Sequence, residues 1–170
     1  MATDQAAPAA STDTAGRQCN LLQLFVKGAS FEAPQVPGIL FGHDQPELVF
    51  DVTNTYEICS EASAKLGEVY SVIVRVTVQA EAGGKTLFLI EVEQGGLFEI
   101  TGYATDDERD RLLRIKGGEA LYPYARELVG SLVSRAGFPR LQLKPVNFES
   151  LYSRAMREYE ESLVKGLAKA

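Results

Sequence analysis

The sequence predicts a single α+β domain in which an antiparallel sheet has helices packed on one face. In the first half of the chain, apolar and polar residues alternate with the period of two that is typical of half-buried strands. In the second half, apolar residues recur at helical spacing between capping residues. Because the strands come before the helices and do not alternate with them, the order favours α+β over a parallel α/β sheet.

Alternation predicts the strands in chain order. Glu47 to Cys59 and Val69 to Glu81 carry apolar residues at every second position, and each therefore has one apolar face. The turn Gly83-Gly84 joins the second of these to Leu87 to Glu93, as in a hairpin. Leu21 to Phe31 and Leu97 to Thr101 complete a sheet of at least four strands.

Capping residues delimit the helices. Thr105 and Glu108 form a capping box at the start of a short helix that we expect to end at Gly117. The main core helix is predicted over Leu121 to Ala136, opening at Pro123 and closing with a Schellman cap at Gly137-Phe138-Pro139.

A final helix follows an extended segment, and Asn147 is its predicted N-cap. We expect residues 1–19 to be a disordered tail, residues 20–156 to be the folded domain and residues 157–170 to be a frayed tail. The N-terminus lacks the apolar core of a secretory signal, and no apolar run reaches the roughly 20 residues that span a bilayer.

Composition excludes several classes of function. A formal charge of -6 disfavours nucleic acid and anionic lipid as partners. Cys19 and Cys59 have no CxxC partner, and with a single histidine they predict neither a disulfide framework nor a metal site, which favours the cytoplasm. That histidine, His43, lies in a loop with no nucleophile beside it, so it is interpreted as a solvated side chain.

Three Gly-Gly pairs occur, at residues 83–84, 95–96 and 117–118, and none continues into a phosphate-binding motif. We interpret them as turns and caps. The sequence therefore predicts no catalytic residue, no cofactor and no enzyme activity.

One feature points to a partner. The face of Leu87 to Glu93 that should be solvated carries Leu87 and Leu89 beside two glutamates. A surface kept partly apolar for a partner and scattered surface leucines explain this about equally well.

Several short blocks occur in a fixed order along the chain. They are Ser30-Phe31-Glu32-Ala33-Pro34, Val74-Arg75-Val76-Thr77-Val78, Glu93-Gln94-Gly95-Gly96-Leu97-Phe98, Tyr122-Pro123-Tyr124-Ala125-Arg126-Glu127 and the run from Phe138 to Phe148. Together they closely resemble the bacterial SecB export chaperone family, over about Leu21 to Tyr152.

The resemblance implies a homotetramer, a dimer of dimers with outward four-stranded sheets and long helices between them. It also implies an ATP-independent chaperone that captures unfolded secretory precursor proteins in the cytoplasm and delivers them to SecA, the translocase ATPase. Such a mechanism needs no chemistry, because extended grooves bind apolar side chains and backbone without demanding one sequence.

The resemblance also assigns residues. It places the SecA-binding surface at Glu32, Leu89 and Glu91, and it places positions that govern assembly at Ile90, Val92 and Gln94. The client groove is expected between the final helix and the loop Pro34 to Pro46, lined by Phe41, Leu121, Tyr124, Leu128, Leu143, Phe148 and Tyr152.

Two alternatives stay open at this point. One is a SecB-like chaperone dedicated to an antitoxin. The other, from a different class, is a small-molecule carrier or enzyme that uses the concave side of a helix-backed sheet.

Overall fold

The computed structural model describes residues 16–42 and 45–167. The predicted solvated position of His43 and most of the predicted disordered tail, residues 1–15, lie outside the described residues. Within them, the predicted α+β fold with a four-stranded antiparallel sheet is confirmed.

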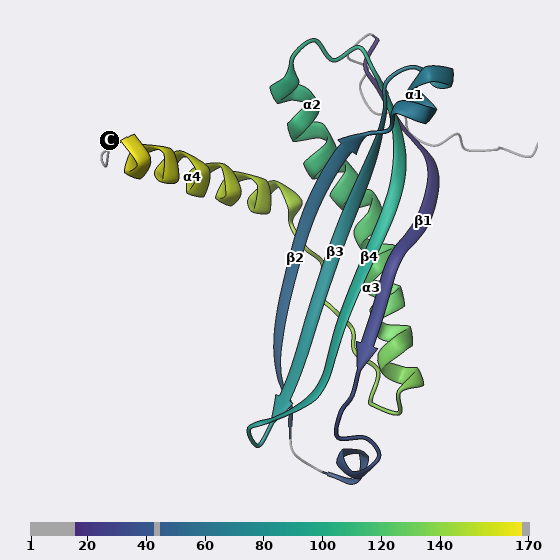
Figure 1. The fold of residues 1–170 in the computed structure, drawn as a ribbon, viewed down its shortest axis with the longest axis vertical. Helices are drawn as coiled ribbons and strands as arrows, with labels where there is room; N and C mark the ends of the chain where they lie inside the picture. Colours follow the sequence, from purple (N-terminus) through teal and green to yellow (C-terminus); the bar gives the residue numbers. More distant parts are fainter. Residues whose placement is uncertain (1–15, 43–44, 168–170) are drawn as a thin grey trace, which may run out of the picture.

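The sheet is built from β1 (Gln18–Glu32), β2 (Glu47–Ile58), β3 (Val69–Ala82) and β4 (Lys85–Thr101). Their order across the sheet is β1-β4-β3-β2, and every pair is antiparallel (Figure 1). The strands β1 and β2 are therefore the two edges. This order leaves β3 and β4 as the central strands, where the sheet core lies.

The strand β4 is longer than the sequence predicted, because it runs without a break through Gly95-Gly96. The prediction that this pair is a turn separating two strands is wrong. A Cβ on Gly95 would overlap the ring of Phe25, and one on Gly96 would lie 2.8 Å from Leu121 Cδ2. Both glycines are therefore packing positions, where a neighbouring side chain fills the space of a Cβ.

The turn at Gly83-Gly84 is confirmed. Both residues have positive φ, 55° and 72°, and they connect β3 to β4 directly. Two consecutive residues in this conformation match the right-handed twist of the paired strands, and glycine adopts it without strain.

The connection between β2 and β3 contains a short helix that the sequence did not predict, α1 (Ser60–Leu66). The hydroxyl of Ser63 accepts a hydrogen bond from the Val69 N–H at 3.0 Å, which ties the helix to the start of β3. Figure 1 shows α1 at the end of the sheet where β2 finishes.

The helical half forms one continuous helical path. α2 (Asp106–Leu112) leads through a π-helical turn, η2 (Leu113–Gly117), into α3 (Gly118–Arg135). The predicted stop at Gly117 is wrong, since Gly117 and Gly118 both have helical φ and ψ. Pro123 lies inside α3 and does not open it.

The predicted caps are confirmed where their geometry can be read. The Glu108 N–H donates to Thr105 Oγ1 at 3.2 Å, and the Ser150 N–H donates to Asn147 Oδ1 at 2.9 Å. At the end of α3, the Phe138 N–H donates to the Val133 carbonyl, while Gly137 has φ of 88°. That pair of features defines the Schellman cap.

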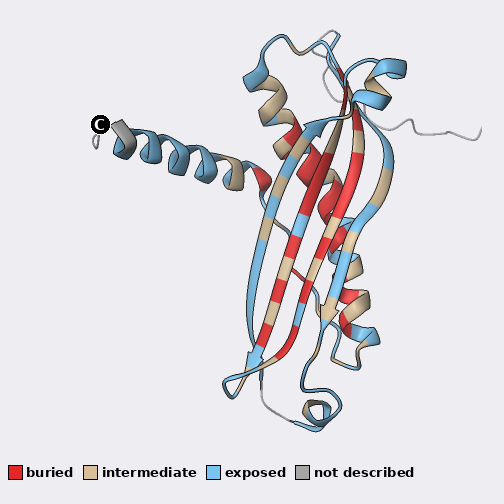
Figure 2. Ribbon diagram, in the orientation of Figure 1, coloured by how far each residue is buried: buried red, intermediate tan, exposed pale blue. Residues whose placement is uncertain are grey.

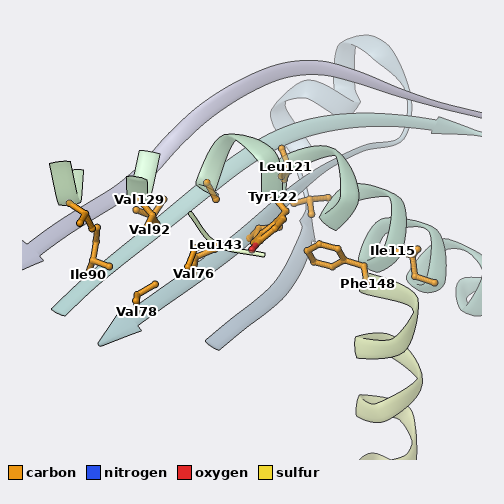
Figure 3. Close-up of a cluster of buried hydrophobic side chains, with 14 of the residues drawn as sticks. Val76, Val78, Ile90, Val92, Ile115, Leu121, Tyr122, Val129, Leu143 and Phe148 are labelled. Atoms are coloured by element: carbon orange, nitrogen blue, oxygen red, sulfur yellow. The ribbon is translucent and has the colours of Figure 1, made fainter. Parts of the chain in front are cut away.

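The core lies between α3 and the inner face of the two central strands. In Figure 2 the buried residues follow β3, β4 and the adjoining side of α3, whereas β2 is largely exposed. Alternate residues of β3 and β4 point toward α3, and Figure 3 shows their side chains meeting those of the helix. The fully buried members include Val74, Val76, Val78, Ile90, Val92, Leu121, Val129 and Val133.

The last helix, α4 (Phe148–Leu167), continues beyond Met156, where the domain was expected to end. Its first residue, Phe148, is buried against Gly118 and Tyr122, and its other residues are half-buried or exposed where described. Figure 1 shows α4 leaving the sheet and α3 at a steep angle.

Candidate functional site

The edge strand β2 carries apolar side chains that no element covers. Leu48 and Phe50 lie on the face that α3 covers in β3 and β4, yet both are exposed. The helix spans the central strands and does not reach this edge, so an apolar strip beside β2 is open to solvent. We call the surface that runs along this strip, with the cavities at its two ends, the β2 track.

The first cavity of the β2 track has a volume of about 370 Å³. It lies between the 3-10 helix η1 (Gly38–Phe41), the start of β2 and the segment after α3. Its wall is mostly apolar, and the members that matter here are Ile39, Leu40, Leu48, Leu87, Phe138 and Leu141.

The second cavity, of about 280 Å³, lies between β2 and the start of α4. β2 contributes residues 51–54, the helical path contributes Arg114, and α4 contributes Phe148, Leu151, Tyr152, Arg154, Ala155 and Glu158. Both cavities border β2, one near Leu48 and the other near Asn54, so the track follows the strand.

A polar cluster fixes the helical path against β2 beside the second cavity. Asn54 Nδ2 donates to the Arg114 carbonyl at 2.5 Å, and Arg114 Nη1 donates to the Asn54 carbonyl at 3.1 Å. Arg114 lies in the π-helical turn, so these two hydrogen bonds tie that turn to β2. Asn54 Oδ1 is buried and has no hydrogen-bond partner among the described residues.

Asp110 is the centre of this cluster. Its Oδ1 accepts from the Tyr56 hydroxyl and from Arg114 Nε, both at 2.8 Å. Burial, together with the hydrogen bond to Asp110, raises the pKa of Tyr56 to about 12. Burial also raises the pKa of Tyr152, which faces Asp110 from α4. The cluster therefore joins β2, the helical path and α4.

The seven residues predicted for the groove divide into two groups. Phe41 is 79% exposed, Tyr124 is exposed, and Leu128 and Tyr152 are half-buried. Leu121 lies wholly in the core and is not available to a groove, while Leu143 and Phe148 are also buried. Of the seven, Phe148 and Tyr152 line a cavity of the β2 track.

Sequence reasoning missed Leu40, Leu48 and Leu141, which line the first cavity. Alternation placed Leu48 on the apolar face of its strand, but it could not reveal that this strand is an edge left uncovered. Strand order depends on long-range pairing, which periodicity does not encode.

The three residues assigned to SecA binding lie together on the outer face, the sheet face opposite α3. Strand pairing sets Glu32 of β1 opposite Leu89 of β4, two residues from Glu91. Arg75 pairs with Glu93 and lies 4.0 Å from Glu91, measured from Nε to Oε1. The outer face nevertheless keeps an acidic character around an exposed leucine.

The three residues assigned to assembly lie on the inner face of the sheet, which α3 covers. Ile90 and Val92 are completely buried beneath α3, and the Gln94 amide donates to the Phe25 carbonyl at 2.8 Å. None of them is on a free surface, so any influence on assembly acts through the position of α3 and β1. Exposed apolar residues occur instead on β1, at Leu21, Leu22 and Val26.

Residues 16–42 and 45–167 contain no group of three or more His, Cys, Asp or Glu side chains arranged to hold a metal ion. Among the helices in those ranges, none is both long enough and apolar enough to cross a bilayer.

A known protein family matches most of this chain. The sequence model described as preprotein translocase subunit SecB matches residues 12–159. The chain belongs to the SecB family. SecB proteins are chaperones of protein export and not enzymes.

Individual relatives agree with this assignment. The protein-export protein SecB of Hydrogenovibrio crunogenus is 38% identical over 152 residues, which cover 89% of this chain and 97% of that SecB. Among solved structures, the Mycobacterium tuberculosis SecB-like chaperone in complex with an antitoxin peptide superimposes with a TM-score of 0.57. At 18% identity, over 75% of this chain and 90% of that one, this likeness shows a shared fold.

Proposed function

We propose that this chain captures unfolded secretory precursor proteins in the cytoplasm without ATP, holds them along the β2 track and delivers them to SecA. The observation that carries the proposal is the exposed apolar strip on an edge strand, with a cavity at each end. An unfolded polypeptide presents the two matching groups, apolar side chains and unpaired backbone.

The geometry of the track suits an extended segment. Leu48 and Asn54 are six residues apart on β2, which corresponds to about 20 Å of strand. Because β2 pairs with β3 on one side only, its other side is an open edge among the described residues, apart from the Asn54 carbonyl that Arg114 occupies, and this edge can pair with a client strand.

Assembly extends this surface. The exposed apolar residues of β1 support pairing between copies and, with the family membership, a dimer of dimers. Four chains would carry 4 × (-6) = -24 charges, which steers basic, unfolded chains toward the assembly. Several weak contacts on linked tracks then hold one client more firmly than a single track can.

The capture proposal is tested by aggregation of a refolding precursor. The tetramer, in severalfold excess and without nucleotide, should suppress light scattering. Phe50→Ser removes an apolar side chain from the track and should raise the concentration needed for half-maximal suppression about threefold to tenfold. The matched control is Val49→Ser, which removes an even more exposed neighbour from the opposite face of the same strand. Failure of the unmodified chain to suppress scattering contradicts the capture proposal.

The delivery proposal is tested on the outer face. Glu91→Lys reverses a charge beside Leu89 and should weaken SecA binding by about tenfold or more while client capture is kept. Binding to SecA measured by calorimetry and capture measured by light scattering separate the two functions. Equal loss of both in this variant means that the assignment of Glu91 is mistaken.

A second candidate is a chaperone dedicated to an antitoxin, because the structurally similar Mycobacterium tuberculosis protein is a SecB-like chaperone bound to an antitoxin peptide. Co-purification from cells distinguishes the two candidates. Recovery of SecA and varied precursors supports export, whereas recovery of one small antitoxin supports the alternative. A monomer that holds a small ligand in native mass spectrometry would favour the carrier considered from the sequence.

A further inference from the structure

The outer face has an apolar belt at the end that bears α1, away from the acidic residues around Leu89. It consists of Phe25, Ile73 and Leu97, from three neighbouring strands, of which Ile73 is buried and the other two are half-buried. The Phe25 ring lies across Gly95, where a Cβ would overlap the ring and lie 2.9 Å from Ile73 Cδ1. An aromatic ring is thus held on a sheet face that the helices do not cover, because glycine leaves room for it.

The helix α1 converts part of this belt into a depression. A cavity of about 480 Å³ is lined by Phe25 and Leu97 on one side and by Ile58 and residues 59–61 on the other. The Ile58 side chain pairs with Tyr70 on the α3 face, so the apolar surface of the cavity comes from Phe25 and Leu97, which are both half-buried. We call this cavity the α1 notch.

The charges of the α1 notch restrict what can occupy it. Glu57 and Glu61 line it, and no lysine or arginine does. Both glutamates are exposed and continue the negative charge of the outer face. An acidic rim around an apolar floor favours an apolar side chain from a segment that also carries basic residues.

The distance to the acidic residues around Leu89 sets the length of such a segment. Leu97 and Glu91 are six residues apart on β4 and lie on the same face, which corresponds to about 20 Å. An extended peptide covers that distance in about six residues. A single short segment can therefore reach the notch and the acidic residues together.

We propose that the α1 notch is a second contact point of the outer face, which takes an apolar side chain about six residues from the basic residues that bind beside Glu91. The proposal rests on the proposed docking role of the outer face and adds a specificity element to it. The partner it selects is a basic segment with one apolar anchor at that spacing.

Two synthetic peptides test the notch on the complete chain. One carries a Lys- and Arg-rich cluster with a tryptophan six residues away, and the other has serine in place of the tryptophan. The tryptophan peptide should bind about tenfold more tightly by calorimetry. Because the chain contains no tryptophan, emission comes from the peptide alone, and a blue shift on binding reports burial of the anchor.

Variants assign the site. Leu97→Ser removes an apolar, half-buried wall residue of the notch and should abolish both the affinity difference and the blue shift, whereas Val49→Ser elsewhere on the outer face should keep both. Ser60→Leu fills the notch from an exposed position on α1 and should act like Leu97→Ser, which covers the case of a misfolded first variant.

The peptide measurements distinguish failure of the notch proposal from failure of the proposed docking role of the outer face. If both peptides bind equally and Glu91→Lys weakens both, the outer face docks basic segments and the notch proposal is overturned. An equal loss of the blue shift in Phe41→Ser would place the anchor in the β2 track and overturn it as well. Absence of binding by either peptide counts against the docking role of the outer face itself.

Discussion

Gly118 is a position where close packing requires a glycine. A Cβ at this position would overlap the ring of Phe148, the first residue of α4. The ring also packs edge-to-face against Tyr122, with centroids 5.9 Å apart. The contact between α3 and α4 therefore depends on the absence of a side chain at Gly118.

Gly118→Ala should lower the free energy of unfolding by about 1–2 kcal/mol, because the cost of displacing a buried ring exceeds the gain in helix propensity. Urea denaturation followed by circular dichroism measures the change. The control is Gly38→Ala, where no atom lies within 4 Å of the added Cβ and the stability should change by less than about 0.5 kcal/mol. A neutral result at Gly118 would show that Phe148 moves aside freely.

Tyr56 gives a pH dependence with a definite sign. Burial and the hydrogen bond to Asp110 raise its pKa from 10.0 to about 12, so the folded chain holds the phenol proton more tightly than the unfolded chain does. The stability from this group is fully present below about pH 10, and it is lost as the pH rises toward about 12. Tyr56→Phe should therefore be about 1 kcal/mol less stable at pH 8, with a difference that shrinks above pH 10.

Urea denaturation of both chains between pH 8 and pH 12 measures this difference. Tyr159→Phe, which removes a hydroxyl from an exposed position on α4, should match the unmodified chain at each pH. A gap between Tyr56→Phe and the unmodified chain that stays constant or widens above pH 10 would contradict the assignment.

At the scale of elements, the sequence predicted the features that depend on interactions between neighbouring residues. The alternation in β2 and β3, the turn at Gly83-Gly84 and the caps at Thr105 and Gly137 each depend on a few neighbouring residues, and all are confirmed. Each signal could be read from the sequence because the atoms that satisfy it lie within a few residues of one another.

Two of the wrong element boundaries have one common cause. The sequence predicts turns or caps at Gly95-Gly96 and Gly117-Gly118, but each pair makes room for residues distant in sequence, among them Phe25, Leu121, Val72 and Phe148. The sequence does not distinguish a glycine that permits close packing from a glycine that permits a turn. The distinction depends on which side chain packs against the glycine, and the tertiary fold determines that.

The same limit applies to the candidate site. The outer-face position of Leu89 and Glu91 could be predicted from alternation, and that of Glu32 from the family resemblance. The lining of the β2 track could not, since it depends on β2 being an edge and on the angle at which α4 leaves the body. Leu121 shows the error: its helical spacing is that of a core residue, and the core is where it lies.

At the scale of the whole molecule, the exposed apolar residues of β1 bear on the number of chains in the assembly. Val26 is 54% exposed on an edge strand, and the described residues leave it uncovered in a single chain. Burying such side chains between copies is the usual source of stability for a homo-oligomer.

Val26→Lys should shift the proposed tetramer to smaller species, because a charge at this edge is costly to bury between copies. Native mass spectrometry measures the number of chains, and circular dichroism checks that each chain keeps its fold. Val49→Lys, at an exposed position on the opposite edge strand and the outer face, should leave the mass at four chains. An unchanged mass for Val26→Lys would place the interface elsewhere.

The helix α4 is attached to the rest of the domain near one of its ends, through Phe148. The helix is 20 residues long, or about 30 Å, and near its start it is held by a buried ring, an Asn147 cap and the Arg111–Glu149 ion pair. A tilt of about 10° at that end would move the other end by about 5 Å and leave the core between α3 and the sheet packed. Because the second cavity lies between β2 and α4, the angle of this helix sets how wide a side chain the cavity can admit.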